Sequence, residues 1–274
     1  MKRFSLIAGA VALALATGPA YALSCGKSSA GFDQFKRDFA KVAKANGVGN
    51  RGLKALRDAK YLKKVIAYDQ KQARYFKKAG RSGANIDRHY KRSLKNMGGL
   101  RNVRSKLKRM NRFLSGVEKR YGVQKEVLVT IWGKETAFGG YTGRIDTINA
   151  LASLSHDCRR PGLFRPNLIA ALKIVDKRWI HRNRMRGAAH GELGQVQFMA
   201  ANYLRYAKDG NSDGRVDLIG NSRDALTSAA NFLRAHGWQP GGSYAPGTTN
   251  FRVLNSWNES TAYQHTISRI ASQL

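Results

Sequence analysis

Residues 121–139 read YGVQKEVLVTIWGKETAFG, and this stretch decides how the rest of the chain is interpreted. On a helix, Leu128, Ile131 and Trp132 form an apolar stripe, because side chains three and four positions apart lie on one face. The next residue on that face is Glu135. The sequence therefore predicts a helix over residues 123–136 whose apolar face ends in a carboxylate.

The predicted surroundings of Glu135 favour a raised pKa. Partial burial disfavours a charged carboxylate, and the negative end of the helix dipole adds to that effect. A carboxyl group that keeps its proton near neutral pH can act as a general acid. The alternative is a structural glutamate paired with one of the many arginines of this chain.

The remaining sequence predicts a mainly α fold. Apolar residues recur at helical spacing in five further segments: 32–45, 98–121, 163–178, 199–207 and 225–235. No series of alternating apolar and polar residues stands out, so we expect only a small sheet. A length of 274 residues fits one large domain or two smaller ones.

The charge of the chain is its most unusual property. It carries 49 Lys and Arg against 17 Asp and Glu, a formal net charge of +32. Such a protein is attracted to polyanions, and residues 51–120 are especially basic. No DNA- or RNA-reading motif is visible, so we expect no specific nucleic-acid partner. The alternative is a set of solvated helix faces without a partner.

The first 22 residues have the pattern of a cleaved secretory signal. Lys2 and Arg3 precede an apolar run, and Ala20-Tyr21-Ala22 supplies small residues at the spacing of a cleavage site. The run is short for a membrane anchor, and no segment predicts a transmembrane helix in the mature chain. Export would place Cys25 and Cys158 in an oxidising compartment, which predicts a disulfide between them. Two free thiols are the alternative.

Several motifs in order resemble a known family. Residues 132–139 (WGKETAFG), 149–155 (NALASLS) and 191–199 (GELGQVQFM) are followed by ANFL at 230–233 and NFRVL at 250–254. Each motif alone is weak, but the ordered set resembles the MltB-type lytic murein transglycosylases from about residue 31 to residue 271. The resemblance implies a lysozyme-like catalytic domain. We expect a basic helical region at 23–122, packed on a catalytic core at 123–274.

The resemblance also implies a reaction. Such enzymes cleave the β-1,4 bond between N-acetylmuramic acid and N-acetylglucosamine in peptidoglycan without adding water. Glu135 would protonate the leaving oxygen and then, as a carboxylate, take the proton of the C6 hydroxyl, which closes a 1,6-anhydro ring. No cofactor is required. A hydrolase needs a second carboxylate to activate water, and no second motif comparable to that of Glu135 is present.

The resemblance implies further substrate-binding residues. Arg159 and Arg160 would meet a peptide or lactyl carboxylate, and Gln197 would bind N-acetyl groups or the glutamate. Five other side chains are expected at the cleft: Phe198, Phe232, Trp257, Asn258 and Tyr263, with Trp257 and Tyr263 as sugar-stacking platforms. The family often has a serine near position 188 that touches the catalytic glutamate. Ala188 and Ala189 stand there instead, so Glu135 would need another donor.

Residues 209–217 (DGNSDGRVD) contain the first half of an EF-hand loop. Asp209, Asn211, Asp213 and Arg215 occupy positions 1, 3, 5 and 7, but Gly220 stands where a bidentate glutamate belongs. Some members of the resembling family carry one Ca²⁺ with a later aspartate as ligand, and Asp224 matches it. A structural Ca²⁺ is one interpretation, and a hydrogen-bonded turn without it is the other.

The sequence thus predicts a periplasmic, monomeric peptidoglycan lytic transglycosylase, with wall-associated or secretion-complex proteins as further candidate partners. Two other functions stay open. A muramidase-type hydrolase would use Glu135 with water and leave reducing ends in place of anhydro ends. A non-catalytic protein that binds the cell wall or other polyanions would not depend on Glu135.

Overall fold

The computed structural model describes residues 23–79 and 85–274 of the chain, and the predicted signal segment lies outside them. Within this part, twelve α-helices and two short strands form a mainly α fold, as predicted. No helix of the described residues is long and apolar enough to cross a membrane.

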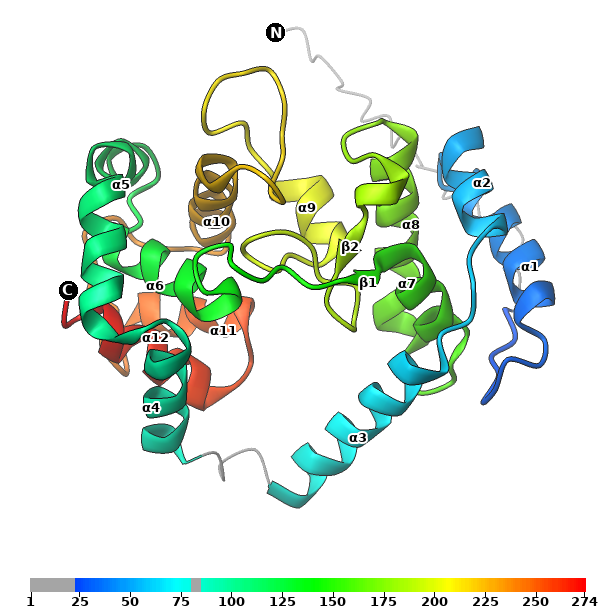
Figure 1. The fold of residues 1–274 in the computed structure, drawn as a ribbon, viewed down its shortest axis with the longest axis horizontal. Coiled ribbons are helices and arrows are strands. Elements are labelled where there is room, and N and C mark those ends of the chain that lie inside the picture. The colour runs from blue at the N-terminus through cyan, green and yellow to red at the C-terminus, as the bar shows by residue number, and fades with distance from the viewer. Residues whose placement is uncertain (1–22, 80–84) are drawn as a thin grey trace, which may run out of the picture.

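The helices form two groups (Figure 1). In one group, α1 (Phe32–Ala45) and α2 (Asn50–Arg57) pack on α7 (Thr147–His156) and α8 (Pro161–Asp176), and α3 (Lys63–Ala79) also contacts α7. Three buried aromatic or aliphatic side chains, Phe35, Phe39 and Leu56, help to fill the core on this side. The apolar spacing around residue 35 thus predicted a helix and also its buried face.

The second group surrounds α6 (Lys125–Thr136). This helix contacts four others: α4 (Ile86–Asn96), α5 (Gly99–Tyr121), α10 (Ser222–Ala235) and α12 (Thr261–Ala271). All seven residues from Val127 to Gly133 are consequently buried, so α6 is apolar on every side rather than on one stripe. The predicted helix is confirmed, and its predicted stripe of Leu128, Ile131 and Trp132 is buried, but neighbouring helices cover its other faces as well.

The remaining elements link the two groups. Strand β1 (Ile145–Asp146) pairs antiparallel with β2 (Arg186–Gly187), the small sheet that the sequence predicts. A short 3-10 helix, η1 (Arg182–Arg184), and α9 (Ala200–Tyr206) flank the intervening loops, and α11 (Thr249–Trp257) precedes α12. The predicted division at residues 122 and 123 falls between α5 and α6 and stays a prediction.

A disulfide joins the start of the described chain to the end of α7. Cys25 and Cys158 are bonded, with their Cα atoms 5.0 Å apart, as the sequence predicts. Gly26 forms a parallel bridge with Asp157 beside this bond. The segment before α1 is therefore fixed next to Arg159 and Arg160.

Candidate active site

Glu135 lies in the last turn of α6. The chain leaves this helix through Ala137, Phe138 and Gly139, all with positive φ. Trp132 packs edge-on against Phe138, with ring centroids 5.3 Å apart. A helix buried all round and closed by this turn holds the glutamate at a fixed position.

Two neutral donors from distant elements bind the carboxyl of Glu135. The Tyr263 hydroxyl donates a hydrogen bond of 2.6 Å to Oε1, and Nε1 of Trp257 donates one of 3.1 Å to the same oxygen. Glu135 is half-buried, and no Lys, Arg or His of the described part of the chain forms an ion pair with it. The interpretation of Glu135 as one half of an arginine pair is therefore wrong.

Burial raises the pKa of Glu135 above its ordinary value. The hydrogen bond from Tyr263, the charge of Lys134 and the hydrogen bond from Trp257 act in the opposite direction and are outweighed. The effect of burial dominates because a charge loses hydration energy in an apolar surrounding. The predicted direction of the pKa is thus confirmed, and the group is suited to hold a proton for a leaving group.

Tyr263 is not a sugar-stacking platform. Its side chain is 3% exposed, and burial beside the Glu135 carboxyl raises the pKa of the Tyr263 hydroxyl well above its ordinary value. A phenol that keeps its proton is a permanent donor to Glu135. Together with Trp257 it provides the contact that the alanines at 188 and 189 cannot make.

An aromatic cluster supports Trp257 from behind. The Trp257 ring lies 5.4 Å from the ring of Phe198 and 5.2 Å from that of Phe232. Phe198 and Phe232 are 3% and 2% exposed, and Phe232 stacks on His236 with a centroid distance of 4.0 Å. Sequence reasoning placed both phenylalanines at the substrate, but they are buried among other rings, whereas Trp257 is half-buried.

The loop between β2 and α9 holds the end of α6 through Gln195, which sequence reasoning missed. Nε1 of Trp132 donates a hydrogen bond of 2.8 Å to Oε1 of Gln195, and the Thr136 hydroxyl donates one of 2.6 Å to the Gln195 carbonyl. The predicted Gln197 has a left-handed φ of 51°. Its amide donates to the carbonyls of Gly194 at 2.8 Å and Thr142 at 3.2 Å, rather than to Glu135.

Arg159 and Arg160 already hold a carboxylate of the protein itself. Both guanidinium groups donate to Asp69 of α3, whose side chain is 2% exposed. The Arg159 and Arg160 side chains remain 29% and 36% exposed. Sequence reasoning did not identify Asp69, because a single acid in a basic helix carries no local signal.

His190 connects this cluster to Glu192. Its Nε2 lies 3.0 Å from Oδ1 of Asp69, and its Nδ1 lies 3.4 Å from Oε1 of Glu192. Burial alone would lower the pKa of His190, but the two carboxylates raise it to about 9. Burial likewise opposes a lowered pKa at Asp69 and Glu192, and their cationic partners nevertheless lower both values. All of these groups are therefore charged at neutral pH.

The predicted cation loop folds as a series of turns. Asp209 accepts backbone hydrogen bonds from Ser212 at 2.6 Å and Gly214 at 2.8 Å. Asp224 is buried and accepts from Gly210 and Asp217, both at 2.8 Å. Among residues 23–79 and 85–274, no three or more His, Cys, Asp or Glu side chains are grouped so that they could hold a metal ion.

Three other predicted residues have local roles. Asn258 is exposed at the end of α11, where its side-chain oxygen accepts a hydrogen bond of 3.0 Å from the backbone of Ser260. Asn211 donates to Asp213 at 2.8 Å within the turn series. The Arg215 backbone donates 2.9 Å to Asp213.

Residues 31–246 match the family described as the transglycosylase SLT domain. This chain belongs to that family. The predicted membership of the MltB-type lytic transglycosylases is therefore confirmed.

Individual relatives agree with the family match. Over 126 residues the chain is 36% identical to membrane-bound lytic murein transglycosylase B of Escherichia coli K12, and this segment covers 46% of the chain. The segment spans 35% of that relative, about a third of its length.

Solved structures show the same fold over most of the chain. SltB3 of Pseudomonas aeruginosa, in complex with NAG-anhNAM-pentapeptide, is 25% identical with a TM-score of 0.76, covering 90% of this chain and 80% of that one. Slt35 of Escherichia coli, in complex with calcium, is 23% identical with a TM-score of 0.73, covering 91% of this chain and 95% of that one. The expected lysozyme-like fold is therefore confirmed.

Proposed function

We propose that this protein is a lytic transglycosylase that cleaves peptidoglycan glycan strands, with Glu135 as acid and then base. The observation that carries this function is the Glu135 carboxyl, which is half-buried and, among the described residues, is bound by the neutral donors Tyr263 and Trp257 and by no cation. Burial raises its pKa, which favours the protonated form that a general acid needs. The family membership supports the same reaction class.

The reaction needs one carboxyl group in two protonation states. Glu135 gives its proton to the oxygen of the leaving sugar as the glycosidic bond breaks. The resulting carboxylate takes the proton of the C6 hydroxyl while that oxygen bonds to C1, so the product is a 1,6-anhydro sugar and Glu135 regains its proton. The hydrogen bonds from Tyr263 and Trp257 stabilise the intermediate carboxylate.

A hydrolytic route would need a second carboxylate for water. Glu192 is the acidic residue whose charge contributes to the raised pKa of Glu135. Its carboxylate is engaged by the His190 ring at 3.4 Å and by the His190 backbone N–H at 3.0 Å. A carboxylate bound in this way is a weak base, because its pKa is lowered. This favours the intramolecular C6 hydroxyl over water as the nucleophile.

Arg159 and Arg160 are proposed to bind the carboxylate of a peptide stem with the donors that Asp69 leaves free. Arg159, Arg160, protonated His190, Asp69 and Glu192 together carry a net charge of about +1, which still attracts an anion. SltB3 binds a glycan fragment with a pentapeptide. Gln197, Trp257 and Asn258 are proposed to line the sugar sites.

The deciding experiment is mass spectrometry of peptidoglycan sacculi digested with the protein. Anhydro-muramic ends are expected, and reducing ends would show a hydrolase. Glu135→Gln should lose the activity and keep binding to sacculi, whereas a wall-binding protein without activity would give no product in either form. Gln124→Glu, near the other end of α6, is not a suitable control because Gln124 accepts a hydrogen bond from Trp238. Lys44→Gln is a suitable control because Lys44 is an exposed residue of α1.

We also propose Ca²⁺ binding by the 209–224 loop, with Asp209, Asn211, Asp213 and Asp224 as side-chain ligands and Arg215 as the position-7 residue. Burial raises the pKa of Asp224, and the nearby charges of Asp209 and Asp213 contribute in the same direction. A cation would relieve this repulsion. Slt35 is described in complex with calcium. A rise in melting temperature with millimolar Ca²⁺ is expected, and it should vanish in Asp224→Asn.

We also propose that the protein is exported to the periplasm and that residues 1–22 are removed. The disulfide between Cys25 and Cys158 supports an oxidising location. Amino-terminal sequencing of the protein from a periplasmic extract should begin at Leu23.

A further inference from the structure

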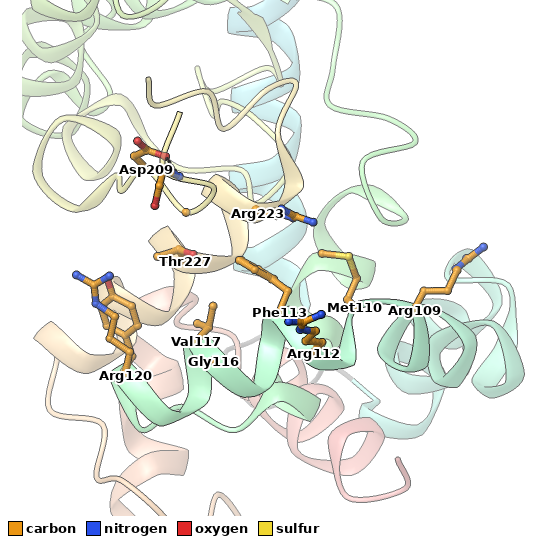
Figure 2. A pocket seen from close by; sticks show the side chains of 13 residues that line it. Arg109, Met110, Arg112, Phe113, Gly116, Val117, Arg120, Asp209, Arg223 and Thr227 are labelled. Atoms are coloured by element: carbon orange, nitrogen blue, oxygen red, sulfur yellow. Dashed lines mark hydrogen bonds between the residues drawn. The ribbon is translucent and has the colours of Figure 1, made fainter. Parts of the chain in front are cut away.

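A cavity of about 690 Å³ lies between α5 and α10, and it shares no lining residue with the Glu135 cluster. Figure 2 shows α5 as one wall, with α10 and the loop that carries Asp209 opposite. Four arginines line it: Arg109, Arg112, Arg120 and Arg223. Arg109 and Arg120 lie towards opposite ends, so cationic groups are spread along the whole cavity.

These guanidinium groups have no acidic partner. Each is exposed, and no ion pair joins any of them to an Asp or Glu of the described residues. The one lining acid, Asp209, is turned to its own loop, where backbone N–H groups of Ser212 and Gly214 bind it. The cavity therefore presents a concentrated positive potential.

The cavity wall is fixed rather than loose. Gly210 approaches α10 so closely that an added Cβ would lie 2.4 Å from both the Arg223 carbonyl and the Thr227 hydroxyl. Thr227 beside it is 4% exposed, so this part of the wall is closely packed.

The arginines are oriented by aromatic rings. The guanidinium of Arg223 lies 5.6 Å from the Phe113 centroid, and that of Arg120 lies 5.5 Å from the Tyr121 centroid. Such contacts hold a guanidinium in place and leave its edge donors free. Each of the two rings that line the cavity thus has an arginine on it.

We propose that this cavity binds a small ligand that carries two phosphate groups, with the arginines of α5 and α10 on its phosphate oxygens. Each phosphate offers three acceptor oxygens and more charge than a carboxylate, which suits guanidinium groups that are spread along two helices. The site shares no residue with the glutamate cluster, so the ligand would bind independently of the cleavage reaction.

Gly116 provides the decisive variant. It is an exposed cavity residue of α5 midway between Arg112 and Arg120, and a Cβ added there meets nothing within 4 Å. Gly116→Glu therefore places a carboxylate among the arginines without a clash. Gly116→Ala is the matched folding control, because alanine favours a helix over glycine. Lys44→Gln on α1 makes the same change of net charge at another surface.

The test is isothermal titration of the full mature protein with glucose 1,6-bisphosphate, glucose and a 12-residue oligothymidylate. We expect binding of the bisphosphate but not of glucose. Gly116→Glu should weaken it at least about tenfold, as expected for the loss of one charge-assisted hydrogen bond, while Gly116→Ala and Lys44→Gln should bind like the parent protein.

Three outcomes would overturn the proposal. They are the absence of bisphosphate binding, an equal loss of binding in Lys44→Gln, and tighter binding of the oligothymidylate than of the bisphosphate. If Gly116→Glu does not fold, as judged by circular dichroism, Arg112→Gln/Arg223→Gln replaces it with the same expected loss. Cleavage of sacculi does not enter the readout, so this result and the proposed transglycosylase activity are decided separately.

Discussion

The Tyr263 hydroxyl and the Glu135 carboxyl lie 2.6 Å apart, although 128 positions separate them in the chain. Burial of α12 against α6 brings them together and removes water from Tyr263. Because the phenol stays protonated, it always donates and Glu135 always accepts. This contact lowers the pKa of Glu135 against the stronger opposing effect of burial. It therefore adjusts how readily the carboxyl gives and regains a proton.

Tyr263→Phe should change the pH dependence of cleavage. Without the phenol, the carboxylate form of Glu135 loses a hydrogen bond, so its pKa rises further. Because the acid form starts the reaction, the loss of activity on the alkaline side should move to higher pH. We expect kcat to fall about tenfold, since the base step loses an oriented carboxylate. Turnover of sacculi measured from pH 4 to 9 gives both quantities.

Tyr203→Phe is the matched control for that variant. Tyr203 is fully buried, and its hydroxyl donates 2.9 Å to the Val216 carbonyl instead of to Glu135. It should lower stability to a similar extent and leave the pH profile in place. An unchanged profile in Tyr263→Phe would mean that the phenol does not act on the Glu135 carboxyl.

Glu135→Gln should abolish cleavage and stabilise the protein. A carboxyl whose pKa is higher in the folded than in the unfolded state loses stability as the pH rises from the unfolded value through the folded one. Glutamine keeps an oxygen for Tyr263 and Trp257 but cannot ionise. The gain in melting temperature should therefore be larger at pH 8 than at pH 4. If Glu135→Gln raised the melting temperature equally at pH 4 and at pH 8, the burial that we assign to this carboxyl would be contradicted.

His190 also contributes less stability as the pH rises, but its variant should differ from the parent protein at low pH rather than at high pH. Its folded pKa of about 9 exceeds its ordinary value of 6.5. Stability from this group is thus fully present below pH 6.5 and is lost as the pH rises through about 9. The free energy at stake is on the order of 3 kcal/mol. Urea unfolding of the protein and of His190→Gln should diverge below pH 7 and converge above pH 9.

A histidine elsewhere provides the comparison for that series. His265 contacts the ring of Phe251, at a centroid distance of 4.9 Å, and takes no part in the Asp69 cluster. His265→Gln should retain the parent slope of stability against pH. If it shows the same flattening as His190→Gln, the Asp69–His190–Glu192 contacts do not produce the effect.

Removal of the disulfide should destabilise the fold strongly. Cys25 and Cys158 close a loop with a sequence separation of 133. In the chain-entropy treatment such a loop contributes about 5 kcal/mol. Cys25→Ser/Cys158→Ser should unfold at correspondingly lower urea concentration, and dithiothreitol should lower the parent protein to the same level without affecting the variant. A variant as stable as the oxidised parent would refute the entropic estimate.

Local sequence patterns predicted six of the twelve helices of the described residues. The spacing of Val103, Leu107 and Leu114 predicted α5, and these side chains are buried as expected. The surroundings of α6 could not be predicted in the same way, because whether Val127 or Val129 is covered depends on which distant helices pack there. An amphipathic pattern indicates a helix with one buried face. A central helix is buried on all faces, so its sequence shows no alternation between apolar and polar sides.

In the candidate active site, too, some residues could be predicted from local sequence and others could not. Glu135 is recognisable because a carboxylate ends an apolar run within one helix. Asp69, Gln195 and His190 act through partners from 59 to 121 positions away, for example Thr136 Oγ1 on the Gln195 carbonyl and His190 on Asp69. No local pattern carries such pairings. The burial of Tyr263 and Phe232 could not be predicted for a related reason, since resemblance of a motif does not report burial.

The first two helices pack against residues 147–176, which are made much later. As the chain emerges from its amino terminus, α1 and α2 can pack only on each other until more than half of the sequence has been synthesised, because α7 and α8 follow later. Their pairings carry a high contact order, so they close slowly. A nascent chain of this kind stays extended for a long time, the condition in which a polypeptide can be threaded through a narrow translocation pore before its tertiary structure locks.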